Sequence, residues 1–258
     1  MQNSSSTTIT LDMIAVPEGS FTMGTRYSAE ETAEGEETPP HRVWLSAYQM
    51  QRTPVTVRQW RSFVADAHYD WPSEVWLGSV REYVRDGEPG PDHPITSVSW
   101  HDCSAFIEWL QRTKHAAYAL PTEAQWEKAC RGSEGQCYPW TRTQPNWDQE
   151  QGAAGRDRLA LRPVGVRPDR ASPYGCLDMC DNIYEWCADW YDDVAYEKRT
   201  AEELTRNPLG QRGNSVLGAR SLRGGPGFQH HWPRCTFRGS ANPEERTPWL
   251  GFRVALAV

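Results

Sequence analysis

The stretch Ser172–Tyr191, SPYGCLDMCDNIYEWCADWY, carries glycine and proline in its first half and carboxylates among apolar and aromatic residues in its second. Short extended runs broken by glycine and proline also occur elsewhere: FTMG (21–24), HRVWLSAYQM (41–50), PITSVSW (94–100), SLRGG (221–225) and GFRVALAV (251–258). Glycine (20) and proline (19) make up about 15% of the 258 residues, which predicts long irregular connections. No β-α-β alternation is visible, so a doubly wound parallel sheet is disfavoured.

Composition indicates a soluble globular protein. The mean hydropathy is low, at -0.73, but 13 Trp, 10 Tyr and 6 Phe supply an aromatic core and argue against disorder. A net charge of -7 and a pI near 5.5 argue against nucleic acid as a partner. No apolar run approaches the roughly 18–20 residues of a membrane span. The first 21 residues lack the features of a secretory signal, so we expect a cytoplasmic protein without a membrane partner.

Helical periodicity occurs in three segments. Residues 56–67 place Val57, Trp60 and Phe63 on one face, and a similar stripe runs through residues 100–114. Residues 122–131 begin with Pro-Thr followed by Glu and Gln, which is typical of a helix N-terminus. The pattern predicts an α+β fold with few helices.

The seven cysteines are scattered without a CxxC pair, which argues against a zinc ribbon or a thioredoxin motif. Cys176 and Cys180 lie four residues apart and could meet. For a cytosolic protein, buried reduced thiols are the favoured interpretation.

Seven segments in this order resemble the sulfatase-modifying-factor family, the formylglycine-generating-enzyme-like branch of the C-type lectin fold. They are VPEGSFTMG (16–24), TPPHRVWLSAYQMQRTPVTVRQWRSFV (38–64), HPITSVSWHDCSAFIEWL (93–110), LPTEAQWEKACRG (120–132), SPYGCLDMCDNIYEWCADWY (172–191), SLRGG (221–225) and LGFRVA (250–255). The resemblance implies one α+β domain over residues 13–258 after a flexible segment, residues 1–12. We expect residues 41–50 to pair with residues 251–258 and bring the termini together. Arg223, Arg238 and Arg253 are expected to cap carbonyl groups of the irregular backbone.

The same resemblance implies structural calcium. In the family's calcium-binding turn, two carboxylates and two carbonyl oxygens would come from Asp178, Glu185, Asp181 and Ile183. Asp181 stands where the family usually has glycine, and an aspartate tolerates the left-handed conformation that glycine would adopt. A second calcium site is matched less closely by Asn146, Trp147 and Asp157.

The resemblance fails at the catalytic centre. Formylglycine-generating enzymes hold copper between two cysteines, but the corresponding positions are Gln229 and Arg234. Copper is therefore not expected, and His230 and Cys235 are the remaining catalytic candidates. Iron stays open as a cofactor, with further ligands needed from His41, His93 or His101.

The interval 228–249 suits a recognition surface, because aromatic, histidine and small polar side chains on a rigid scaffold are typical of one. It also resembles the displayed segment of retroelement-diversified variable proteins of this fold. The candidate ligand-binding residues are Phe228, His230, His231, Trp232, Phe237, Ser240, Asn242, Thr247 and Trp249. We therefore expect a module that binds an unidentified protein or small molecule. The alternative is a metal-dependent oxidoreductase that acts on a peptide or small thiol, so whether the chain is an enzyme stays open.

Overall fold

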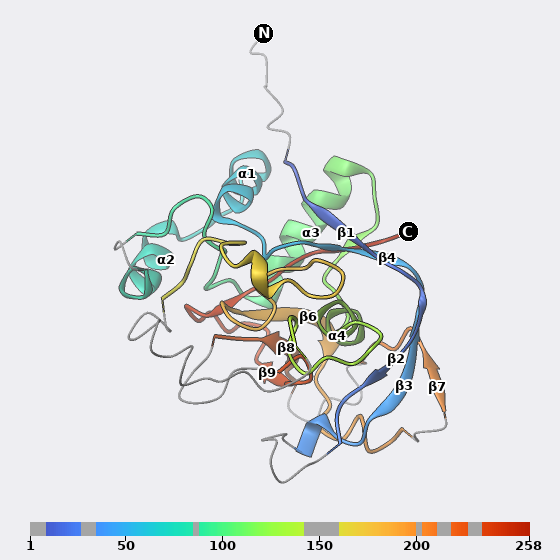
Figure 1. The fold of residues 1–258 in the computed structure, drawn as a ribbon. Helices are drawn as coiled ribbons and strands as arrows, with labels where there is room; N and C mark the ends of the chain where they lie inside the picture. The colour runs from blue at the N-terminus through green and yellow to red at the C-terminus, as the bar shows by residue number, and fades with distance from the viewer. Residues whose placement is uncertain are drawn as a thin grey trace.

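The computed structural model describes residues 9–26, 35–84, 88–141, 160–199, 203–210, 218–226 and 234–258 (Figure 1). Within them lie the helices α1 (Val57–Ala67), α2 (Ser73–Val80), α3 (Trp100–Lys114) and α4 (Glu123–Arg131). The strands are β1 (Met13–Val16), β2 (Gly19–Met23), β3 (His41–Leu45), β4 (Tyr48–Gln51), β5 (Tyr118–Ala119), β6 (Tyr184–Trp190), β7 (Leu204–Arg206), β8 (Arg220–Gly224), β9 (Gly239–Ala241), β10 (Leu250–Gly251) and β11 (Ala255–Ala257). This mixture of helix and sheet confirms the predicted α+β class.

The three predicted helices are confirmed, and their starts follow from capping. Thr56, Ser99 and Thr122 each accept a hydrogen bond from the third residue of the helix, whose side chain bonds back to the cap. The remaining helix, α2, was not predicted. It has no side-chain cap, and its apolar residues do not form one clear face, since Val75 is 72% exposed.

The ends of the domain meet in one sheet, with strand order β1-β4-β11-β5. Strand β4 lies between β1 and β11 and pairs antiparallel with both, with Met50 opposite Ile14 and Ala255 (Figure 1). The predicted pairing of the terminal segments is therefore confirmed. Residues 41–50, expected as one strand, are instead two strands in different sheets, because the chain turns after Leu45. Residues 94–99 form no strand, because their groups bond to scattered loops such as Val55 and Thr247.

A second sheet, β10-β6-β8-β9, crosses the middle of the domain, and a third has the order β2-β3-β7. Helix α4 packs against the middle sheet and β2 (Figure 1). Helices α1 and α3 share an aromatic core with the C-terminal segment, where the rings of Trp60, Phe106 and Phe252 contact one another.

The N-terminal boundary differs from the prediction. Residues 9–12 pack on the domain rather than forming part of a flexible tail. Ile9 is only 4% exposed, and the Thr10 and Asp12 carbonyl groups accept hydrogen bonds from Gln59 and Arg52. Residues 1–8 lie outside the described residues.

Buried arginines hold the irregular backbone, as predicted. The Arg253 guanidinium donates to the carbonyl groups of Gln51, Arg52 and Leu177. Arg223 bonds the Thr236 and Phe237 carbonyl groups and Arg238 those of Glu36 and Asp192, so each arginine links distant segments.

Candidate functional site

The two strands that flank the predicted recognition interval, β8 and β10, meet at one end of the middle sheet. There Leu250 lies opposite Tyr184, and Tyr184 lies opposite Gly224. The Tyr184 N–H donates to the Trp249 carbonyl over 2.7 Å, which joins these two segments of the chain. This end of the sheet therefore gathers β6, β8 and β10 beside the interval.

Four half-buried aromatic rings lie at this end in two pairs, and we call them the aromatic shelf: Tyr83, Tyr184, Phe237 and Trp249. Tyr83 and Trp249 meet edge to face, with ring centroids 4.5 Å apart, and the Tyr184 and Phe237 centroids are 6.0 Å apart. The Tyr184 ring lies so close to Gly225 that a Cβ there would collide with it, and Gly225 also has a positive φ of 126°. The glycine thus keeps the tyrosine ring in its place.

The structure brings only part of the predicted set to the shelf. Phe237 and Trp249 belong to it. Ser240 lies in β9 opposite Ser221, towards the other end of the sheet. Exposed Asn242 caps a turn, because its side chain accepts from the Glu244 N–H. The carbonyl of Thr247 accepts from Ser97 and Leu250. Phe228, His230, His231 and Trp232 lie outside the described residues.

A layer of buried ion pairs supports the sheet. Glu185 accepts two hydrogen bonds from Arg253, of 2.6 and 2.8 Å, and a third from the indole of Trp126. Glu123 pairs with Arg238 in the same bidentate way. Burial would raise the pKa of Glu123, but the Arg238 and Arg223 charges lower it to about 2. These charges are fixed, so the sheet is a rigid base for the shelf.

The predicted calcium turn is held by guanidinium groups. Arg162 donates to the Asp181 carbonyl, and the Asp181 carboxylate lies 3.3–3.5 Å from Arg162, Arg167 and Arg170. Glu185 is engaged by Arg253, as described above. Guanidinium groups already bond the Asp181 carbonyl and Glu185, so the turn as arranged offers fewer free oxygens than the six to eight that calcium needs, although Asp181 Oδ1 is buried without a hydrogen-bond partner among the described residues. Calcium binding by this turn stays an untested prediction.

Asp178 lies in the same turn. It carries the left-handed conformation expected of Asp181, with φ 59°, and its carboxylate accepts from the Gly165 N–H over 2.7 Å. Burial and the nearby Asp181 charge raise the pKa of Asp178 to about 6. Asn146, Trp147 and Asp157, the second predicted calcium site, lie outside the described residues.

The predicted iron ligands do not converge. His41 contacts the Pro39 carbonyl and the Arg199 guanidinium, His93 accepts from the Gly90 N–H, and exposed His101 pairs with Glu244. Burial and the Arg199 charge lower the pKa of His41 to about 4. These histidines form no metal-binding group with other described residues.

The positions that correspond to the family's copper cysteines give no described thiol pair. Arg234 forms an ion pair with Glu37, and Gln229 lies outside the described residues. Of the two catalytic candidates, His230 lies outside the described residues, and Cys235 is fully buried and is joined by a disulfide to Cys130. The prediction of reduced thiols is therefore wrong for these two cysteines.

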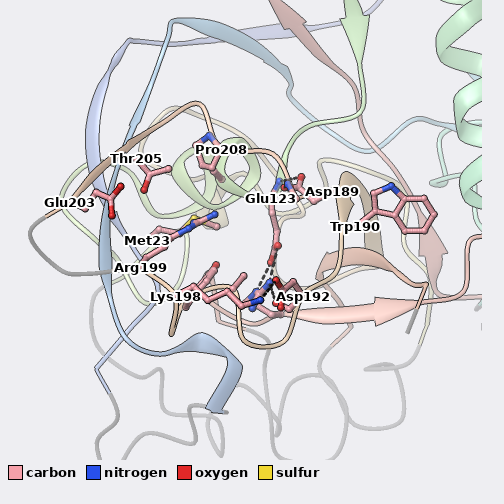
Figure 2. A pocket seen from close by; sticks show the side chains of 15 residues that line it. Met23, Glu123, Asp189, Trp190, Asp192, Lys198, Arg199, Glu203, Thr205 and Pro208 are labelled. Atoms are coloured by element: carbon pink, nitrogen blue, oxygen red, sulfur yellow. Dashed lines mark hydrogen bonds and ion pairs between the residues drawn. The ribbon is translucent and has the colours of Figure 1, made fainter. Parts of the chain in front are cut away.

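A polar cavity of about 300 Å³ lies away from the shelf, between the start of α4 and the segment after β6 (Figure 2). Its walls include Lys198, paired with Asp192, and the buried carboxylate of Asp189. Asp189 accepts hydrogen bonds from the N–H groups of Glu123 and Gly210. Burial, reinforced by the Glu123 charge, raises the pKa of Asp189 to about 7. No sequence pattern predicted this cavity.

Sequence reasoning also missed Tyr83 and Tyr184. Tyr184 stands within the quoted stretch between Ile183 and Glu185, and residues alternate between faces along a strand, so Tyr184 lies opposite two buried neighbours. Recognition of a strand there would have identified it. Tyr83 had no such signal, because it lies in a 3₁₀ turn, Arg81–Tyr83, far away in sequence.

Solved structures define the class of fold. Treponema denticola variable protein 1 superposes with a TM-score of 0.74 at 20% identity, covering 98% of this chain and 97% of that one. The family profile described as "Sulfatase-modifying factor enzyme 1-like domain" matches residues 2–258, so the chain belongs to this family. Relatives include the formylglycine-generating enzyme of Streptomyces coelicolor, 30% identical over 95% of this chain and 89% of the relative. The inactive Cα-formylglycine-generating enzyme 2 of Mus musculus is 28% identical, over 94% of this chain and 85% of the relative. The resemblance inferred from the motifs is thus confirmed.

Proposed function

We propose that this chain is a binding module of its family, and that its recognition surface consists of the aromatic shelf together with residues 228–249. The observation that carries the proposal is that two half-buried rings of this interval each pair with a half-buried ring from a distant segment at one end of the sheet. Large apolar rings that are only partly covered lose further water contact when a partner binds, which makes them typical anchors of interfaces.

The base of the shelf is ordered before any partner arrives. The Tyr184–Trp249 backbone bond and the Gly225 contact hold two of the rings, and Arg223 holds the Phe237 carbonyl. Binding therefore costs little ordering of these side chains, which favours affinity. A partner that presents apolar or aromatic groups within a peptide or a small molecule fits this surface best.

The alternative, a metal-dependent oxidoreductase, has less support. Arg234 stands at one copper-cysteine position and is neutralised by Glu37. A relative described as inactive shows that a protein of this family need not keep the activity. Oxygen consumption with a thiol peptide tests the alternative directly, and turnover above the level of heat-treated protein would favour it.

Peptide selection tests the binding proposal. Random peptides displayed on phage are selected on the folded chain and then measured against Phe237→Ala and a matched control, Trp44→Ala, which removes a half-buried ring on β3 outside the proposed surface. We expect Phe237→Ala to weaken binding at least about tenfold, as removal of an anchor ring does, and Trp44→Ala to change it less than about twofold. Peptides that bind Phe237→Ala and Tyr184→Ala as tightly as they bind wild type would overturn the shelf as the site.

Diversification of the surface has its own test in the DNA. If residues 227–250 are varied by a retroelement, the neighbouring DNA holds a near-copy of their codons that differs at adenines. A neighbourhood without such a copy would leave a binding module with a fixed surface.

A further inference from the structure

Three cysteines from distant parts of the chain meet inside the domain. Cys130 lies on α4, Cys180 precedes β6, and Cys235 lies within the recognition interval. Their Sγ atoms all lie within 4.8 Å of one another, and those of Cys130 and Cys180 are 3.5 Å apart. Because 50 and 105 residues separate Cys130 from its two neighbours, the fold rather than local sequence brings them together.

The cluster is dry and consists of sulfur donors. Each of the three residues is at most 1% exposed, and among the described residues no histidine or carboxylate joins the group. Structural zinc takes four ligands in a tetrahedron, whereas copper(I) accepts fewer and prefers soft thiolates. A set of three sulfurs shielded from water therefore suits copper(I) better than zinc.

The position of the cluster is separate from the family's catalytic pair. The two copper-cysteine positions fall on Gln229 and Arg234, and the Arg234 side chain pairs with Glu37. Cys235 instead finds its sulfur partners on α4 and before β6. Its N–H donates to the Cys137 carbonyl, and Cys137 lines an open pocket with Gly24 and Arg131.

We propose that Cys130, Cys180 and Cys235, when reduced, form a binding site for a single copper(I) ion. The disulfide between Cys130 and Cys235 is the oxidised form of the same cluster. Two molecules of a small thiol reduce it: they supply two electrons and two protons, leave as one small-molecule disulfide, and free both cysteine thiols. Copper(I) then displaces protons from the thiols that bind it and is not itself oxidised or reduced.

Anaerobic competition with bicinchoninate, a coloured copper(I) chelator, tests the site in the full chain reduced with a phosphine. We expect one copper(I) ion per chain to be withdrawn from the chelator. Cys180→Ala, which keeps the Cys130 and Cys235 pair, should weaken copper(I) binding by more than about 100-fold, beyond the loss caused by removing a supporting residue. The control Cys103→Ala, at a buried thiol on α3 in the other core cluster, should bind as wild type does.

Several results would overturn the proposal. They are failure of the reduced wild-type chain to compete, equal affinity in Cys180→Ala, and preferential binding of zinc(II) over copper(I) in a matched competition. A melting curve for each variant separates loss of the site from loss of the fold. Since bound copper(I) stabilises only the folded chain, it should raise the melting temperature of wild type and of Cys103→Ala, but not of Cys180→Ala. These readouts do not depend on ligand binding at the shelf.

Discussion

The two ends of the middle sheet both carry aromatic residues, but they use them differently. At the end near Tyr184 the rings are half-buried and lie beside the recognition interval. At the opposite end the Arg220 guanidinium lies between the indoles of Trp100 and Trp190, 3.7 Å from each ring centroid, and also donates to the Ala188 carbonyl. The cation at the second end is enclosed by described residues of the chain, whereas our proposal assigns the half-buried rings of the first end to a partner. A count of aromatic residues therefore does not distinguish packing from recognition, but the partners of each ring do.

The largest effect is expected beneath the sheet, where both ends depend on buried charge. Glu185→Ala removes the partner of Arg253 and leaves a guanidinium uncompensated at 0% exposure. Loss of one member of a buried pair costs about 3–5 kcal/mol in the free energy of unfolding. Urea denaturation measures it.

The matched control is Arg58→Ala, which breaks an ion pair with Asp92 whose side chains are 63% and 64% exposed. It should cost less than about 1 kcal/mol. Equal costs for the two variants would contradict the view that the buried layer carries the sheet.

The next largest effect is expected at the end of the middle sheet where Arg220 lies between two indoles, which we call the closed end. Arg220→Ala removes the cation between two indoles and the hydrogen bond to Ala188, which should cost about 1–3 kcal/mol. Exposed Arg206, whose guanidinium is 4.6 Å from the Trp44 ring centroid, is the control, and Arg206→Ala should cost under about 1 kcal/mol. Denaturation midpoints measure the loss in the free energy of unfolding for both variants. A loss in Arg220→Ala as small as that in the control would show that the cation does not stabilise this end of the sheet.

Asp189, near the closed end, predicts a pH dependence. Its pKa in the folded chain is raised to about 7, so between its ordinary value and pH 7 the folded chain binds more protons than the unfolded chain. This carboxyl therefore lowers the free energy of unfolding as the pH rises from about 4 to about 7. Melting temperatures across that range should fall less steeply in Asp189→Asn than in wild type, and parallel curves would refute the raised pKa.

The smallest effect is expected from calcium. Because guanidinium groups already bond the Asp181 carbonyl and Glu185, millimolar calcium or a chelator should leave the melting temperature unchanged. A rise with calcium that Asp178→Ala abolishes would show instead that the ion displaces the arginines.

Much of the fold follows from local signals in the sequence. The apolar stripes of residues 56–67 and 100–114 and the Pro-Thr start of residues 122–131 predict three helices, and the terminal strands follow from their β-rich composition. Helix α2 and the turn after Leu45 escaped, because the first lacks a cap and the second lies inside a continuous β-like run.

The site was predicted less well, because it depends on which distant segments meet. Phe237 and Trp249 fall within a recognisable interval, whereas Tyr83 joins them only through the tertiary fold. The arginines around Asp181 come from a segment without periodicity, so the turn pattern alone suggested calcium. The cysteine cluster likewise joins three segments that no spacing rule connects.

A crossed comparison of Phe237→Ala with Arg220→Ala tests the central claim most directly, when calorimetric affinity for a selected peptide and the free energy of unfolding are measured on both. We expect Phe237→Ala to lose at least about tenfold in affinity with the smaller loss of stability, and Arg220→Ala to lose stability while its affinity stays within about twofold. The opposite pattern, with binding lost at Arg220 and kept at Phe237, would contradict the assignment of recognition to the aromatic shelf.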